Sequence, residues 1–389
     1  MVYYRGQLWR DRCNCRSPFE LNRHRFYRIK NRYLRTKKTG VNPVNFASDN
    51  VTGAAPEILQ SLLIANEGDT PGYGGDELTL SVKSRLQETF ETEAEIFLVA
   101  TGTAANALAI SAITPSHGSV LCHWTSHIYE DECGAPEFFS GGARLIPVDG
   151  LRGKMCPIDL TQKAANGRGD VHMLQPSAAS VTQASEMGTI HSPKELSTLS
   201  NVCRENGLRL HMDGARFANA LVEQSWTPAE MSWKAGVDIL SFGATKNGAL
   251  GCEAVIIFDP ALADEFAFKR KRTGHLFSKM RLLAAQMSAY LENDLWLNNA
   301  RHANAMAQRL YKGLKEIPGV DFPYPVEANM LFPRLPDGMA QELKTQGFVF
   351  YDNRWDPGIC RLVTAFNTKK SAVDQFISAA SSFSSSKRG

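Results

Sequence analysis

The sequence predicts an α/β protein in which a mostly parallel β-sheet lies between helices, followed by a smaller α+β domain at the C-terminal end. Two observations lead to this prediction. From residue 95 to residue 258, strand-length apolar runs alternate with stretches of helical pattern, which is typical of a parallel sheet covered on both faces. After Pro260 the pattern changes to two long helices, followed by short strands and further helices.

The composition is that of an ordinary folded protein. The 389 residues are 43% apolar and 21% charged, and 43 basic side chains stand against 40 acidic ones. These values exclude a collagen-like chain and an intrinsically disordered chain. No segment of the sequence approaches the roughly 18 consecutive apolar residues that a membrane-spanning helix needs, so we expect no membrane partner.

The first 40 residues differ from the rest in charge. They contain 12 Lys and Arg but only two acidic residues, whereas the remainder contains 31 basic and 38 acidic residues. We interpret residues 1–40 as a basic, disordered extension outside the folded domains. A targeting peptide or a segment that contacts nucleic acid or a membrane is the alternative. We expect no nucleic-acid partner, because the extension has no helix-turn-helix pattern.

The eight cysteines are scattered, and Cys13 and Cys15 form the one closely spaced pair. Their spacing fits neither a zinc site nor a disulfide framework, so we expect no metal. The chain also begins without an apolar signal-peptide stretch. We therefore expect a reducing compartment, the cytoplasm.

The expected elements divide into a large domain, residues 41–290, and a small domain, residues 291–389. In the large domain the apolar runs predict strands at 95–99, 119–122, 144–148, 171–174, 208–212, 238–242 and 254–258, with a helix at 103–113 after the first. Beyond them we expect helices at 279–293, 295–315, 337–346 and 370–382, and strands at 329–332, 348–351 and 360–363.

Two charged residues follow strands that we expect to be neighbours. Asp213 comes at the end of one strand and Lys246 follows the next, with one helix and one strand between them. Ligands of open α/β sheets bind at the carboxyl ends of the strands. A lysine there can bind an aldehyde cofactor covalently, and a carboxylate can pair with the ring nitrogen of pyridoxal phosphate. Taken singly, Lys246 reads as a surface lysine and Asp213 as a helix N-cap.

Three further features follow strand ends. Gly102 and Thr103 begin the first helix, where free backbone N–H groups suit a phosphate. His127 follows the second strand and is placed to stack on a ring or to bind a substrate. Arg216 comes three residues after Asp213, near a helix start. Each feature also has a plain structural reading, but their joint order along the chain is far more specific than any one of them.

Together these residues resemble the threonine aldolase branch of the fold type I pyridoxal-phosphate enzymes. The resemblance runs from about residue 45 to residue 380, and so excludes the basic extension. The matching segments are 46–52, 73–76, 102–103, His127, 213–216, Lys246 and 360–364.

The resemblance implies a role for each matching residue toward pyridoxal 5′-phosphate. These roles are a covalent bond from Lys246, a contact to the pyridine nitrogen from Asp213, a contact to the phenolic oxygen from Arg216, phosphate binding by Gly102 and Thr103, and ring stacking by His127. A basic residue of a neighbouring subunit, Lys279 or Arg281, is expected to complete the phosphate site.

The resemblance also implies which residues bind the substrate. Ser48, Arg216 and Arg361 are expected to hold the substrate carboxylate, with Arg361 forming a bidentate fork. One position departs from the family pattern, because Gln183 stands where many members carry a second active-site histidine. Since an amide is no base at neutral pH, removal of the β-hydroxyl proton would fall to His127 or to a bound water.

The implied activity is that of a lyase. The enzyme is expected to cleave L-threonine, L-allo-threonine and related β-hydroxy-α-amino acids to glycine and an aldehyde, with Lys246 and His127 as catalytic residues. A homodimer or homotetramer with active sites at the subunit interface is implied as well. The alternatives are a pyridoxal-phosphate-dependent β-eliminating lyase, aminotransferase or racemase, and more remotely a non-catalytic regulator that binds the cofactor.

Overall fold

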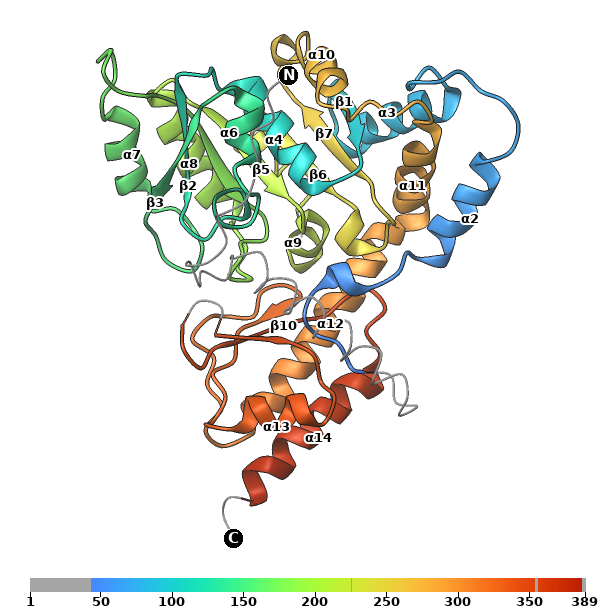
Figure 1. The fold of residues 1–389 in the computed structure, drawn as a ribbon, viewed down its shortest axis with the longest axis vertical. Coiled ribbons are helices and arrows are strands. Elements are labelled where there is room, and N and C mark those ends of the chain that lie inside the picture. The colour runs from blue at the N-terminus through green and yellow to red at the C-terminus, as the bar shows by residue number, and fades with distance from the viewer. Residues whose placement is uncertain (1–42, 225, 354–355, 387–389) are drawn as a thin grey trace, which may run out of the picture. The chain divides into compact units, whose positions relative to one another are not determined.

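The computed structural model describes residues 43–224, 226–353 and 356–386 (Figure 1). The prediction for the basic extension, residues 1–40, lies outside this range. The chain from Asn45 onward forms one compact unit. None of the helices described is long and apolar enough to cross a membrane.

A seven-stranded sheet forms the centre of the large part of the unit. Its strand order is β1-β7-β6-β5-β4-β2-β3. β7 runs antiparallel to both of its neighbours, and the other adjacent pairs are parallel, which confirms the mostly parallel sheet. The strands are β1 (Glu95–Val99), β2 (Gly118–His123), β3 (Arg144–Val148), β4 (Gln175–Thr182), β5 (Arg209–Gly214), β6 (Ile239–Gly243) and β7 (Glu253–Ile257).

Both faces of this sheet are covered by apolar side chains. In β1, Ile96 and Leu98 belong to the larger core cluster, whereas Phe97 and Val99 belong to a second cluster on the other face. Such a strand reads as a continuous apolar run. The helices and 3-10 turns of this part are η2 (Asp49–Val51), α2 (Pro56–Ala65), α3 (Glu77–Phe90), α4 (Gly102–Ile113), α5 (His127–Glu130), α6 (Ala135–Ser140), α7 (Pro157–Ala165), α8 (Pro193–Glu205), α9 (Phe217–Glu223), η3 (Trp233–Ala235), η4 (Thr245–Asn247), η5 (Pro260–Leu262), α10 (Phe266–Arg272), α11 (Arg281–Leu291) and η6 (Glu292–Asp294).

Local sequence signals set the starts of several helices. Thr101 caps α4 by accepting a hydrogen bond from the backbone N–H of Ala104 at 3.1 Å. Ser192 and Glu195 form a reciprocal capping box at α8, with a proline at its first position. The cap at Thr101 leaves Gly102 and Thr103 as the first two residues of α4.

The C-terminal part contains a small antiparallel sheet packed with helices. Its strands are β8 (Met330–Leu331), β9 (Tyr351–Asp352) and β10 (Cys360–Val363), and its helices are α12 (Leu295–Lys315), α13 (Met339–Thr345) and α14 (Lys370–Ser386). The long helix α12 runs from the large sheet down into this part (Figure 1). Phe46 hydrogen-bonds Val349 and Val363 at 2.8 Å each, so the first described segment joins this sheet before it enters the large part.

The predicted strand at 171–174 is wrong. These residues form turns, and Val171 is 93% exposed. The strand begins at Gln175 instead and continues through alanines and serines that are buried between two neighbouring strands. These residue types have little preference for strands, so the apolar pattern did not indicate them. The strand expected at 348–351 likewise shares only Tyr351 with β9.

Phe242 is expected to carry much of the stability around β6. It is completely buried, and its ring lies 5.6 Å from Phe90, 5.8 Å from Phe217 and 5.6 Å from Trp296, measured between ring centres. Phe242→Ala should lower the free energy of unfolding by about 3–5 kcal/mol, as measured by urea denaturation. Phe268→Ala is the control, because Phe268 is 77% exposed. An equal effect of the two changes would contradict this account.

Candidate active site

A cavity of about 340 Å³ lies at the carboxyl ends of β5 and β6. Five of the residues that the sequence predicted as a site line it: Gly102, Thr103, His127, Asp213 and Lys246. Segments that are far apart in the sequence therefore meet at one edge of the sheet, as the topology of parallel strands requires.

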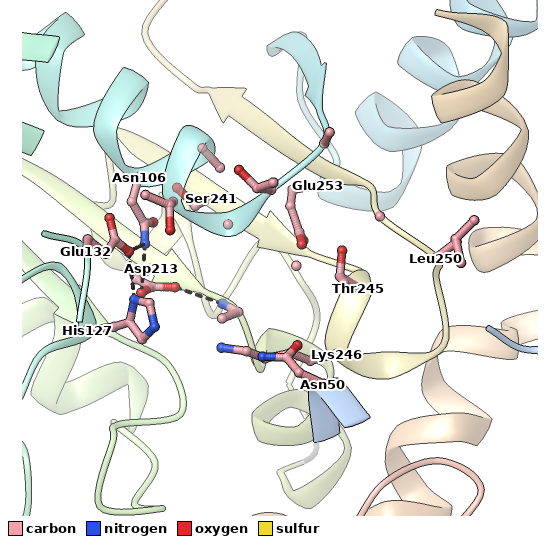
Figure 2. A pocket seen from close by; sticks show the side chains of 18 residues that line it. Asn50, Asn106, His127, Glu132, Asp213, Ser241, Thr245, Lys246, Leu250 and Glu253 are labelled. Carbon is pink, nitrogen blue, oxygen red and sulfur yellow. Dashed lines mark hydrogen bonds and ion pairs between the residues drawn. The ribbon is translucent and has the colours of Figure 1, made fainter. Parts of the chain in front are cut away.

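The two strands that carry Asp213 and Lys246 are adjacent, as expected. β5 pairs with β6 in parallel, and Asp213 lies opposite Ser241. Lys246 follows in the 3-10 turn η4, directly after β6. Figure 2 shows both side chains among the residues that line the cavity.

Asp213 is a buried carboxylate held by uncharged donors. Its side chain accepts hydrogen bonds from the backbone N–H of Ala215 and from Nδ2 of Asn106, both at 3.0 Å. The residue is 3% exposed. Within the described part of the chain it forms no ion pair at contact distance, so its negative charge is not neutralised by a bonded cation.

Asn106 connects Asp213 to a second acid. Its amide nitrogen also donates to Oε1 of Glu132 at 2.9 Å. The same oxygen of Glu132 lies 2.8 Å from Nδ1 of His127. Figure 2 shows these four side chains gathered on one side of the cavity.

The protonation of His127 is set by this network. Burial, the largest single influence, lowers the pKa of His127, but the hydrogen bond to Glu132 and the charges of Glu186 and Asp213 together raise the pKa above its usual value. Burial also raises the pKa of Glu132, and the neighbouring charge of Asp213 adds to that effect. Nδ1 of His127 is therefore occupied by Glu132, which leaves Nε2 as the ring nitrogen that is not engaged by this acid.

The start of α4 suits an anion. Gly102 and Thr103 occupy the first two helical positions, where backbone N–H groups have no acceptor within the helix. The positive end of the helix dipole adds to this preference. Both residues line the cavity.

Arg216 is engaged by an acid that the sequence analysis did not assign. Its Nε and Nη2 donate to the two carboxylate oxygens of Asp49 at 2.7 and 2.9 Å, and both residues are buried. Burial by itself raises the pKa of Asp49, but the charges of Arg216 and Lys246 lower it below its usual range. The expected contacts of Arg216 to cofactor and substrate stay a prediction, since the cavity lining does not include it.

The remaining predicted residues lie outside the cavity lining. Ser48 caps the turn η2, where its hydroxyl accepts a hydrogen bond from the N–H of Asn50 at 3.1 Å. Arg361 is 8% exposed in β10. Lys279 lines a separate, open groove, and Arg281 donates to backbone carbonyls of Glu67 and Gly68.

Both polar atoms of the Gln183 side chain are occupied by hydrogen bonds to the backbone. Its amide donates to the carbonyl of His191 at 2.9 Å and accepts from the N–H of the same residue at 3.0 Å. Glu186, three residues later, has a buried carboxylate 3.8 Å from Nη1 of Arg216. Glu186 is therefore the ionisable group that this turn brings to the charged cluster, and the sequence analysis missed it.

Two further polar residues of the cavity were not predicted. Asn106 is a buried amide between alanines in a mostly apolar helix, and that contrast is a signal from which it could have been found. Glu253 lies in β7, where it accepts a hydrogen bond from the N–H of Ala244 at 2.8 Å. Burial raises the pKa of Glu253 to about 7. This carboxyl holds the backbone that leads to Lys246.

The donor set fits pyridoxal 5′-phosphate. The unneutralised, buried carboxylate of Asp213 suits a protonated ring nitrogen, and the start of α4 suits a phosphate. The amine of Lys246 lies in the same cavity and suits an aldehyde. Oδ1 of Asn106 and Oε2 of Glu132 are buried without a hydrogen-bond partner, so the lining has two oxygens that can still take part in hydrogen bonds with a ligand.

Comparisons with known proteins agree with this geometry. Residues 45–335 match the model of the beta-eliminating lyase family. The chain is 42% identical over 328 residues to a low specificity L-threonine aldolase of a Pseudomonas species, covering 84% of this chain and 94% of the relative. It is 44% identical over 306 residues to the low specificity L-threonine aldolase of Pseudomonas aeruginosa, covering 79% and 88%.

A solved structure supports the same assignment. The Leishmania major threonine aldolase superimposes with a TM-score of 0.82 at 29% identity, covering 87% of this chain and 99% of that one. The predicted fold type I architecture is thereby confirmed. The match to the family model and the Pseudomonas relatives together show that the chain belongs to the beta-eliminating lyase family and, within it, to the threonine aldolases.

Proposed function

We propose that this protein cleaves L-threonine, L-allo-threonine and related β-hydroxy-α-amino acids to glycine and an aldehyde. It is an enzyme of a lyase family whose cofactor is pyridoxal 5′-phosphate. The observation that carries the proposal is the placement of Lys246 and the unneutralised Asp213 at the ends of adjacent strands, in one cavity. Purified enzyme given L-threonine, L-allo-threonine or phenylserine should release glycine and aldehyde without an α-keto acid.

Different residues of the cavity would hold different parts of the cofactor. When bound, pyridoxal phosphate supplies an electron sink for the bond that breaks at Cα. Lys246 would hold it covalently through its amine, and Asp213 would keep the ring nitrogen protonated. Gly102 and Thr103 would bind the phosphate through their N–H groups.

Ser48, Arg216 and Arg361 would orient the substrate. A guanidinium that binds both oxygens of the substrate carboxylate fixes the rotation about the bond to Cα. That rotation decides which bond at Cα stands perpendicular to the ring, and an aldolase requires the Cα–Cβ bond to do so. Orientation by these side chains thus selects cleavage over elimination or transamination.

His127 would lie against the cofactor ring in an orientation fixed by Glu132. The hydrogen bond between Nδ1 and Glu132 supports this role, because it fixes the imidazole plane and its tautomer. In this arrangement His127 supports the catalytic centre through contact with the ring.

We also propose that the enzyme acts as a homodimer or homotetramer. An apolar groove lined by Leu63, Phe277 and Lys279 adjoins the cavity, and Leu250 lines both hollows. Leu63 is 66% exposed and Leu250 is 61% exposed. A second copy that covered this groove would bury them and would bring Lys279 or Arg281 toward the phosphate site of its neighbour.

The compartment and the domain division remain part of this proposal. Scattered free cysteines support a reducing compartment, the cytoplasm. We propose a large domain, residues 41–290, and a small domain, residues 291–389, since the small sheet and its helices lie in the second range.

Lys246→Ala should abolish the visible absorption of the bound cofactor, because that absorption depends on the covalent bond to the lysine amine. The measurement is a spectrum after incubation with pyridoxal phosphate and removal of the excess. Lys312→Ala, at an exposed position of α12, is the control and should keep the spectrum. A Lys246→Ala spectrum equal to that of the wild type would show that another lysine holds the cofactor.

Arg361→Ala should raise KM and lower kcat for L-threonine. Loss of a charged hydrogen bond to the substrate carboxylate costs about 3 kcal/mol, which corresponds to roughly 100-fold in kcat/KM. Steady-state assays of aldehyde release give both constants. Arg301→Ala, at an exposed position of α12, should behave as the wild type. Unchanged constants for Arg361→Ala would remove this residue from the site.

Glu132→Gln should lower the pKa of His127. The hydrogen bond to Glu132 favours the protonated imidazole, whereas burial favours the neutral one, so removing the acid takes away the largest influence that raises the pKa. An NMR titration of His127 should then move to lower pH, with His127→Asn used to assign its signal. A titration that stays in place would show that Glu132 does not set the charge of His127.

A further inference from the structure

Glu186 lies in the turn after β4 with its carboxylate buried, at 4% side-chain exposure. Among the described residues its ion-pair partner is Arg216, whose Nη1 lies 3.8 Å away, which is longer than a hydrogen bond. The other guanidinium nitrogens that face acids, Nε and Nη2, are committed to Asp49. Among the described residues no group donates a hydrogen bond to the Glu186 carboxylate, and its oxygens are not among the fully buried atoms without a partner, so a small molecule can reach them.

A carboxylate that receives no hydrogen bond from the protein can accept one from a bound molecule. An ionised carboxylate can only accept hydrogen bonds, so the group that would satisfy Glu186 must be a donor. A substrate hydroxyl meets this requirement, because its O–H can donate where the protein supplies no donor.

The charges around Glu186 belong to the candidate active site. Burial by itself raises the pKa of Glu186, but four nearby basic groups outweigh burial and hold it below its usual range. In order of decreasing effect these groups are Arg216, Lys246, Arg361 and His127. Lys246 and His127 line the cavity, so the carboxylate lies within the electrostatic reach of the reacting groups although Glu186 is not itself part of the lining.

We propose that Glu186 is the catalytic residue that binds the β-hydroxyl of the substrate and accepts its proton. The assignment rests on the proposed cleavage of β-hydroxy-α-amino acids and names the base for that reaction. It concerns a different residue from Gln183, whose amide is occupied by the backbone of His191. It also differs from His127, whose Nδ1 is engaged by Glu132.

The atoms and electrons of this step balance. The O–H bond breaks and its proton passes to an oxygen of Glu186, while its electron pair forms the carbonyl of the leaving aldehyde. The Cα–Cβ bond breaks and its electron pair remains with the glycine fragment. A proton is then added at Cα, so the proton taken from oxygen is matched by the one gained at carbon.

Substrate binding would make Glu186 a stronger base. In the free enzyme the charge of Arg361 contributes to the low pKa of Glu186. A substrate carboxylate bound to Arg361 would neutralise that charge, and the pKa of Glu186 would rise. The base would thus gain strength when a substrate is in place.

Glu186→Gln tests the assignment, because it keeps the size of the side chain and removes the base. Cleavage of L-threonine and phenylserine should fall by about 10²-fold or more in kcat. Exchange of the Cα hydrogen of glycine in D₂O, followed by ¹H NMR, should stay within about threefold of the wild type, since glycine has no β-hydroxyl. The visible spectrum of the bound cofactor should also be retained.

Glu205→Gln, at an exposed position of α8, is the matched control and should leave both reactions unchanged. Equal cleavage by Glu186→Gln and the wild type would overturn the assignment, and so would an equal loss of cleavage and exchange. If Glu186→Gln does not fold, Glu186→Asp replaces it, and slowed cleavage with normal exchange is again expected. A wild-type enzyme that exchanges glycine but releases no aldehyde would instead overturn the proposed function.

Discussion

The register between β5 and β6 is the constraint on which the site depends. Asp213 and His211 point to one side of β5, and Met212 points to the other, into the larger core cluster. A slip of one residue would exchange these faces and would place the carboxylate of Asp213 in apolar surroundings. The buried side chains on both faces therefore fix the register, and the register fixes the position of Asp213 relative to the turn that carries Lys246.

The small sheet helps to position a charged pair of the candidate active site, Asp49 and Arg216. Phe46 is hydrogen-bonded to Val363 of β10 and to Val349, and the chain then brings Asp49 to Arg216 at 2.7 Å. Nδ2 of Asn329, beside β8, donates to the same carboxylate at 3.1 Å. Burying one ion without its partner is strongly unfavourable, so Asp49 and Arg216 each require the other. Through Asn329 this pair is linked to the C-terminal part, and the mutual position of Asp49 and Arg216 decides where the guanidinium can act.

The elements that sequence predicted well are those with a strong apolar pattern. The helix at 295–315 and the strand at 360–363 have the predicted limits, because burial on one side of α12 imposes a helical period and β10 is continuously buried. β4 was misplaced because its buried residues are small. Asp213 and Lys246 could be found from strand ends and spacing. Glu132 stands in a run of acids with exposed neighbours, and nothing local distinguishes it from Asp131; only the fold brings it to His127.

The choice of an amide at Asn106 follows from the charge that Asp213 must keep. A Lys or Arg at this position would form an ion pair with Asp213 and would compete with a protonated ring nitrogen. An acid would place a third carboxylate beside Asp213 and Glu132, and their repulsion would favour protonation. The two hydrogens of an amide nitrogen can serve both acids at once, as the distances of 3.0 and 2.9 Å indicate. A neutral double donor holds both carboxylates in place and leaves the charge of Asp213 available.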